Sequence, residues 1–149
     1  MARDSEARQL ARGRRAARKL LVQALYQLEL TGQPWQDIHA QFAAGPESAS
    51  ADLAFFREAL KHVATERGAL DAELARVADI PPARLDPVAH AILLLGLYEL
   101  RQRPDVPFRV AISEAVELAK RFGATDGYKF VNGVLDRAAT ELRAAERSP

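Results

Sequence analysis

The sequence predicts an all-α protein of about seven helices. Apolar residues recur at the helical spacing along the whole chain, whereas strict alternation of apolar and polar residues is nearly absent. Hydrophobic residues make up 48% of the 149 positions, and only 8 Gly and 8 Pro interrupt them, a composition that excludes disordered and collagen-like chains. A chain of this length buries roughly 70% of its unfolded surface, so one domain or two small lobes sharing a core are expected.

The first strong helical segment runs from about Arg8 to Leu30 and ends at Thr31-Gly32. One arc of its helical wheel is apolar and the opposite arc is basic. The apolar arc contains Ala17, Leu20, Leu21, Ala24, Leu25 and Leu28. The basic arc contains Arg8, Arg12, Arg15, Arg18 and Lys19, and Tyr26 follows on the same side.

Proline and glycine divide the middle of the chain into three further helices. A short second helix starts after Pro34 and ends before Gly45-Pro46. A third runs from Ala51 to about Arg67, and a fourth follows Gly68 and must end before Pro81-Pro82.

The fifth helix has a start signal at Asp86-Pro87, because Asp can cap free amides and Pro has no N–H to leave unsatisfied. It reaches about Arg101 and is apolar nearly all round, so it should be central. A sixth helix begins near Phe108 and ends at Phe122, with Gly123 as its C-terminal cap.

Thr125 or Asp126 is expected to cap the last helix, whose apolar stripe fades into a polar tail at Glu146. Asn132-Gly133 inside this helix ordinarily signals a hairpin. Apolar residues at helical spacing on both sides instead predict a close helix crossing at this point.

No catalytic or metal-binding constellation is found. The chain has no Cys, which excludes disulfides, thiolate nucleophiles and the usual structural zinc sites. His39, His62 and His90 lack metal-ligand spacing, and no Ser lies in a nucleophile motif. The sequence therefore predicts no metal, no cofactor and no enzymatic activity.

The charge is unevenly distributed. The net charge is +1, yet residues 1–19 carry seven basic and two acidic side chains, or +5, which leaves −4 for the rest. A basic arm for phosphates and a solvated, frayed terminus are both consistent with this asymmetry. The longest apolar run, Ala91 to Leu97, is too short to span a membrane, and no signal-peptide cleavage site follows the basic residues, so a cytoplasmic location is expected.

The basic arc with Tyr26 beside it has the composition of a nucleic-acid surface, because arginine binds phosphate and aromatic rings stack on bases. The start of the last helix is a second candidate, since free amides, the helix dipole and Lys129 all favour an anion. Phe130 begins the apolar stripe there, which favours core packing over base stacking for that residue.

Several stretches resemble the signature of the NusB family of bacterial transcription antitermination factors. They are residues 105–120 (DVPFRVAISEAVELAK), residues 129–136 (KFVNGVLD), Arg14-Arg15 with Arg18, residues 23–26 (QALY) and residues 97–100 (LYEL). The chain departs from the usual family pattern at Ala89 and at residues 92–94 (ILL), where an acidic residue and an Ile-Leu-Arg are common.

The resemblance implies a single non-enzymatic domain of two small packed helical bundles, with halves of about residues 8–67 and 68–145. It implies binding to the boxA element of nascent RNA together with the ribosomal protein NusE. Such a protein joins an RNA polymerase antitermination complex with other Nus factors and promotes transcription of ribosomal RNA operons.

The resemblance also assigns site residues. The RNA-binding residues it implies are Arg14, Arg15, Arg18, Gln23 and Tyr26 in the first helix and Asp126, Lys129 and Phe130 at the start of the last. Phe108 and Glu114 are implied as contacts for NusE. Alternatives from the residues are a ribosome-biogenesis factor that binds precursor ribosomal RNA, a basic helix on an anionic membrane and, least supported, an enzyme.

Overall fold

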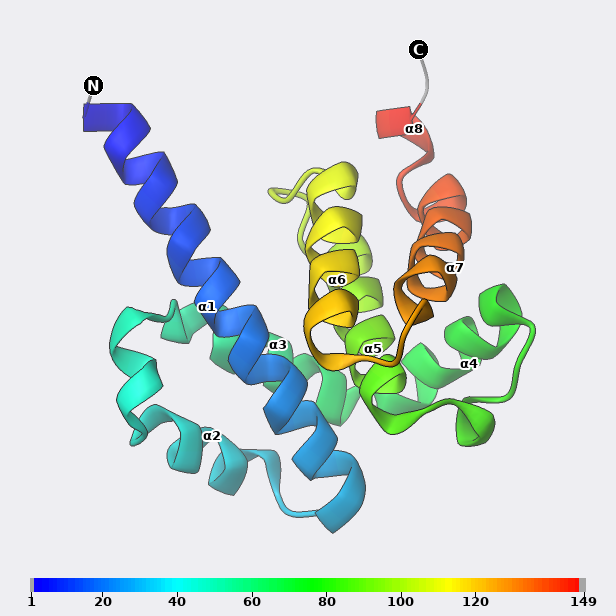
Figure 1. Cartoon of the computed structure of the whole chain (residues 1–149), viewed down its shortest axis with the longest axis horizontal. Helices are drawn as coiled ribbons and strands as arrows, with labels where there is room; N and C mark the ends of the chain where they lie inside the picture. Colours follow the sequence, from blue (N-terminus) through cyan, green and yellow to red (C-terminus); the bar gives the residue numbers. More distant parts are fainter. Residues whose placement is uncertain (1, 148–149) are drawn as a thin grey trace. The chain divides into compact units, whose positions relative to one another are not determined.

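The protein is described by a computed structural model over residues 2–147, and within these residues it contains only helices and connecting loops (Figure 1). The all-α prediction is therefore confirmed. The elements are α1 (Ala2–Thr31), α2 (Trp35–Ala43), the 3-10 helix η1 (Pro46–Ser50), α3 (Leu53–Thr65), α4 (Arg67–Ala78), the 3-10 helix η2 (Pro82–Arg84), α5 (Pro87–Gln102), α6 (Phe108–Phe122), α7 (Gly127–Leu142) and α8 (Ala144–Arg147). The short α8 forms where a polar tail is expected.

The chain divides into two compact units, Met1–Ala64 and Thr65–Pro149. The first unit contains α1, α2, η1 and α3, and the second contains α4, η2 and α5 to α8. The division lies close to the sequence-based boundary between residues 67 and 68.

In the first unit, α1 begins at Ala2 rather than near Arg8, since Asp4 in the first turn favours a helix start. No side chain in residues 2–16 is buried, and the buried stretch begins at Ala17. Helix α2 packs against α1. The Phe56 ring of α3 lies 5.9 Å from the Phe42 ring of α2 and completes this small core.

A single aspartate joins α1 to the start of α3. The Asp52 backbone N–H donates to the Gly13 carbonyl of α1 at 2.9 Å. One Asp52 carboxylate oxygen accepts from the Phe55 N–H at 3.0 Å, the usual way in which an aspartate caps a helix. This junction fixes η1, which precedes Asp52, against the exposed half of α1.

In the second unit, α5 is the central helix and packs against α4, α6 and α7. Every residue from His90 to Leu100 is buried, as the apolar sequence predicts. The predicted start is also confirmed, because Asp86 accepts a hydrogen bond from the Ala89 N–H at 3.1 Å and Pro87 is the first helical residue. Helices α6 and α7 run side by side over α5 (Figure 1).

The close helix crossing lies at Gly96 of α5, and its predicted place at Asn132-Gly133 is wrong. A Cβ atom on Gly96 would lie 2.6 Å from a methyl carbon of Leu135 in α7, whereas one on Gly133 would meet only Arg137, at 3.7 Å. Leu135 is fully buried, while Gly133 lies on the half-exposed side of α7. The glycine that allows the close crossing is therefore Gly96 of α5, the helix that faces α7.

Replacing Gly96 with alanine is expected to destabilise the protein by about 1–3 kcal/mol, because the added methyl forces the buried Leu135 to move. Gly68→Ala is the matched control, since a Cβ there meets nothing within 4 Å. Gly68 lies in the first turn of α4, so alanine there should leave the stability unchanged or raise it slightly. Urea denaturation measures both, and equal effects of the two substitutions would contradict a tight crossing at Gly96.

Helix α8 is held to the start of α6 through Glu146. One carboxylate oxygen of Glu146 accepts from the Phe108 N–H at 2.8 Å, and the other accepts from the Arg143 guanidinium at 2.6 Å. The hydrogen bond from the Phe108 amide holds the pKa of the Glu146 carboxyl below its usual value. The polar tail of the sequence is thus an ordered cap for α6.

Candidate nucleic-acid interface

The exposed face of α1 carries a row of polar and aromatic side chains. Its members recur at intervals of three or four residues, so they lie one above another along the helix. They are Arg12, Arg15, Lys19, Gln23 and Tyr26, all exposed except the half-exposed Lys19. Tyr26 is 38% exposed, and the Gln23 side chain donates to the Lys19 carbonyl at 3.2 Å. We call these five residues the α1 strip.

Arg18 does not belong to this strip, so its predicted exposure is wrong. It is only 3% exposed, and its guanidinium lies 5.2 Å from the centre of the Phe55 ring. The spacing contains the signal for this burial, because Arg18 precedes the buried Leu21 and Leu25 by three and seven residues and therefore shares their face.

Arg14 lies between the exposed and the buried faces. Its side chain is 16% exposed, with Nε 3.9 Å from an Asp52 carboxylate oxygen. Its guanidinium lies 5.3 Å from the centre of the Phe55 ring, so Arg14 and Arg18 both contact this ring. The two arginines therefore pack α1 onto α3, and Arg15 is the member of the predicted trio with an exposed side chain.

The start of α7 has the predicted cap residue but not the predicted cap hydrogen bond. Asp126 occupies the N-cap position with a left-handed φ of 65°, and its side chain accepts no helix amide. One Asp126 carboxylate oxygen lies 3.5 Å from Lys129 Nζ, and both side chains are 66% exposed. The amides of Gly127 and Lys129 already donate to the carbonyls of Ala124 and Asp126. The result is an exposed pair of opposite charges.

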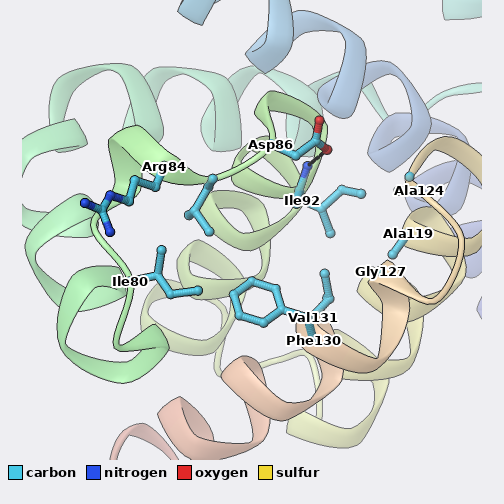
Figure 2. A pocket seen from close by; sticks show the side chains of 12 residues that line it. Ile80, Arg84, Asp86, Ile92, Ala119, Ala124, Gly127, Phe130 and Val131 are labelled. Atoms are coloured by element: carbon cyan, nitrogen blue, oxygen red, sulfur yellow. Dashed lines mark hydrogen bonds between the residues drawn. The ribbon is translucent and has the colours of Figure 1, made fainter.

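Phe130 is half-buried and lines a pocket of about 230 Å³ within the second unit. Figure 2 shows its ring directed toward Ile80, with Asp86 at the far side of the pocket. Apolar side chains make up most of the lining. Gly123, at the end of α6, also borders this space. Phe130 thus packs into its own unit while keeping part of the ring exposed.

The two residues implied as contacts for NusE lie in different environments on α6. Phe108 is only 6% exposed, and the guanidinium groups of Arg109 and Arg147 lie 5.2 and 4.9 Å from the centre of its ring. Glu114 is half-exposed. Val110, one turn before Glu114, is 40% exposed and is an apolar surface position that the sequence did not single out.

Neither a metal-binding cluster nor a membrane-spanning helix occurs in residues 2–147. No group of three or more His, Cys, Asp or Glu side chains there is arranged to hold a metal ion. Across the same part of the chain, no helix has both the length and the apolar character that crossing a membrane requires. His90 is buried and its Nε2 lies 2.6 Å from an Asp71 carboxylate oxygen, a link between α5 and α4.

Known proteins are similar to this chain in both sequence and fold. The family model described as NusB family matches residues 15–140. "Transcription antitermination protein NusB" of Pseudomonas savastanoi pv. phaseolicola is 45% identical over 148 residues, which cover 97% of this chain and 90% of the relative. The protein of the same name from Pseudomonas putida strain GB-1 is 50% identical over 133 residues, covering 89% and 80%.

Among solved structures, T. maritima NusB matches with a TM-score of 0.72 and 30% sequence identity. The match covers 85% of this chain and 90% of that one. The family match includes four of the five residues of the α1 strip, and it covers α7 as far as Thr140. The chain belongs to the NusB family.

Proposed function

We propose that the chain acts in transcription antitermination by binding the boxA element of nascent RNA together with NusE. In this role it joins the RNA polymerase antitermination complex with other Nus factors in the cytoplasm and promotes processive transcription of ribosomal RNA operons. The observation that carries the proposal is the α1 strip, an exposed row of cations that ends in an aromatic ring, in a member of the NusB family.

The NusB family consists of transcription antitermination factors without enzymatic activity, so the chain is not an enzyme. We propose that the chain contributes to antitermination by binding RNA. Single-stranded RNA offers phosphates, unstacked base faces and base edges, and each can be matched by a different side-chain type.

Within the α1 strip, the proposed roles follow from side-chain chemistry. Arg15 neutralises a phosphate, because its exposed guanidinium presents several donors. Tyr26 provides a flat face for an unpaired base, and the Gln23 amide hydrogen-bonds to a base edge. Arg14 reaches RNA only with its exposed edge. Arg18 acts indirectly, since its buried guanidinium supports Phe55 and the position of α1.

The second proposed RNA patch is the exposed charge pair of Asp126 and Lys129 with the partly exposed Phe130. Lys129 suits a phosphate, and Asp126 suits a donor such as a 2′-hydroxyl or a base amino group. For NusE we propose the α6 surface at Glu114 and Val110. The Phe108 ring is buried under the guanidinium groups of Arg109 and Arg147, so we propose that it supports this surface from beneath and does not contact NusE itself.

The test is a salt titration of binding to boxA RNA and to a scrambled RNA of equal length, each with and without NusE. If about four to six phosphates are neutralised, the slope of log affinity against log salt should be roughly −3 to −4. Tight boxA-selective binding that NusE strengthens is the expected result. A slope near zero, or equal weak binding to both RNAs regardless of NusE, would reject the proposed function.

A further inference from the structure

A groove runs between the exposed half of α1 and η1, with a volume of about 600 Å³. Its α1 side carries the basic residues Arg12, Arg15 and Lys19, and its other side is formed by Ala49 and Ser50 of η1. The volume lies within the range of ligand sites in proteins. The groove belongs entirely to the first unit.

The floor of the groove is made of small residues. Gly13 lies against the η1–α3 junction, where its carbonyl accepts from the Asp52 N–H. Helix geometry then places Ala16 between Gly13 and the basic side chains. Because neither residue has a long side chain, the space between the cations and η1 stays open.

The charge of the groove has one sign. Three cationic side chains line it, and no carboxylate is among its lining residues. The Asp52 carboxylate lies outside the lining, where it accepts from the Phe55 N–H and lies near Arg14. Within residues 2–147, the structure gives no ion pair to Arg12 or Lys19. The groove therefore attracts an anion.

The dimensions favour a chain of phosphates over one small anion. Arg12 and Lys19 are seven residues apart, which corresponds to about 10 Å along the helix axis. Arg15 lies between them, and Gln23 and Tyr26 continue the same face beyond Lys19. An extended polyanion with unstacked bases matches both the row of cations and the adjoining aromatic ring.

We propose that this groove holds the phosphate backbone of the bound single-stranded RNA, with Arg12 and Lys19 as phosphate contacts and η1 as the opposite wall. The inference rests on the proposed function and adds a path for the backbone and two cations that the family resemblance does not assign. The bases at the Lys19 end then lie next to Gln23 and Tyr26.

The experiment measures fluorescence anisotropy of a labelled boxA RNA with the full chain and NusE over a range of salt concentrations. The first variant, Arg12→Gln with Lys19→Gln, should weaken binding about tenfold and make the salt slope less steep by about 1.4, or about 0.7 for each phosphate that is no longer neutralised. The matched control is Arg57→Gln, an exposed α3 cation outside the groove lining. It should change affinity less than twofold and leave the slope unchanged.

A second variant tests the groove without changing charge. Ala49→Leu places a larger side chain on the η1 wall and should weaken binding at least threefold. Its control is Ala40→Leu on the exposed side of α2. Thermal melts monitored by circular dichroism establish that each variant is folded. Poly-L-glutamate is the competitor that tests for an acidic peptide as the occupant, and it should displace RNA poorly at equal charge concentration.

The outcomes separate the two levels of the proposal. Selective binding by the wild type that both groove variants leave unchanged would reject the groove and keep the proposed function. The groove would also be rejected if the charge variant lost binding while Ala49→Leu bound RNA like the wild type. It would be rejected, too, if poly-L-glutamate displaced the labelled RNA as effectively as unlabelled RNA does. Absence of selective binding by the wild type would reject both.

Discussion

Arg143→Ala is expected to destabilise the second unit by about 3 kcal/mol, the largest effect on stability anticipated for a single side chain of this protein. The Arg143 side chain is 8% exposed and lies between α7 and α8. Its guanidinium donates to the carbonyls of Leu100 at 2.8 Å, Glu99 at 3.1 Å and Arg103 at 2.8 Å.

The reason for this large effect lies at the end of α5. The Leu100 carbonyl would ordinarily accept from the N–H four residues later, but that residue is Pro104, which has none. Removing Arg143 leaves this buried carbonyl without a donor and also releases Glu146, which Arg143 holds at 2.6 Å.

The measurement is the midpoint of thermal unfolding for Arg143→Ala and for Arg76→Ala as a control. Arg76 forms ion pairs with Glu73 and Glu141, but its side chain is 51% exposed. Ion pairs at the surface contribute little, so the control should melt near the wild-type temperature. A similar loss in both variants would show that ion pairing, and not the carbonyl contacts, gives Arg143 its effect.

Arg15→Ala is expected to weaken RNA binding about tenfold without lowering the unfolding temperature. Arg15 is exposed on the α1 strip, away from the buried face of α1, so its loss removes a phosphate contact and leaves the core intact. For Arg18→Ala we expect the main effect to be a lower unfolding temperature and not a weaker contact with RNA. Its buried side chain packs on Phe55, and truncation should destabilise the protein by about 2 kcal/mol.

Affinity for boxA RNA and the unfolding temperature are measured for both variants. After Arg18→Ala, any loss of affinity should follow the loss of folded protein and diminish at lower temperature. Arg18→Met is the control that keeps an unbranched side chain against Phe55 while removing the charge, and it should recover part of the stability. A direct effect of Arg18→Ala on the salt slope at full folding would contradict the buried, supporting role.

Much of the helical layout follows from local sequence. Asp86-Pro87 starts α5 by capping and by the absence of an N–H at Pro87, both of which act within one turn. The apolar residues of α5 likewise predict a central helix, because burying them all requires neighbours on every side. The sequence does not predict the extra turns of α1 or the helix α8, since the charged ends of helices depend on weak local preferences.

The site was harder to predict, because side-chain environment depends on what packs against each face. The charge asymmetry identified α1 as the basic element, yet the sequence placed Arg18 with Arg15 among the exposed cations. The helical spacing puts Arg18 on the face of Leu21 and Leu25, and the approach of Phe55 from α3 covers it there. In the same way, the groove depends on η1, which lies more than thirty residues from Arg12 in the sequence.

The helical class and the location of the basic residues can be predicted from the sequence, because helical periodicity, caps and charge are properties of neighbouring positions. The family can be predicted from its sequence motifs. The tertiary structure decided which cations face a ring and which line a groove. It also decided that Gly96 rather than Gly133 meets the facing helix, and that Arg143 completes the end of α5. These outcomes require contacts between distant segments, whose geometry is set by packing and not by local preference.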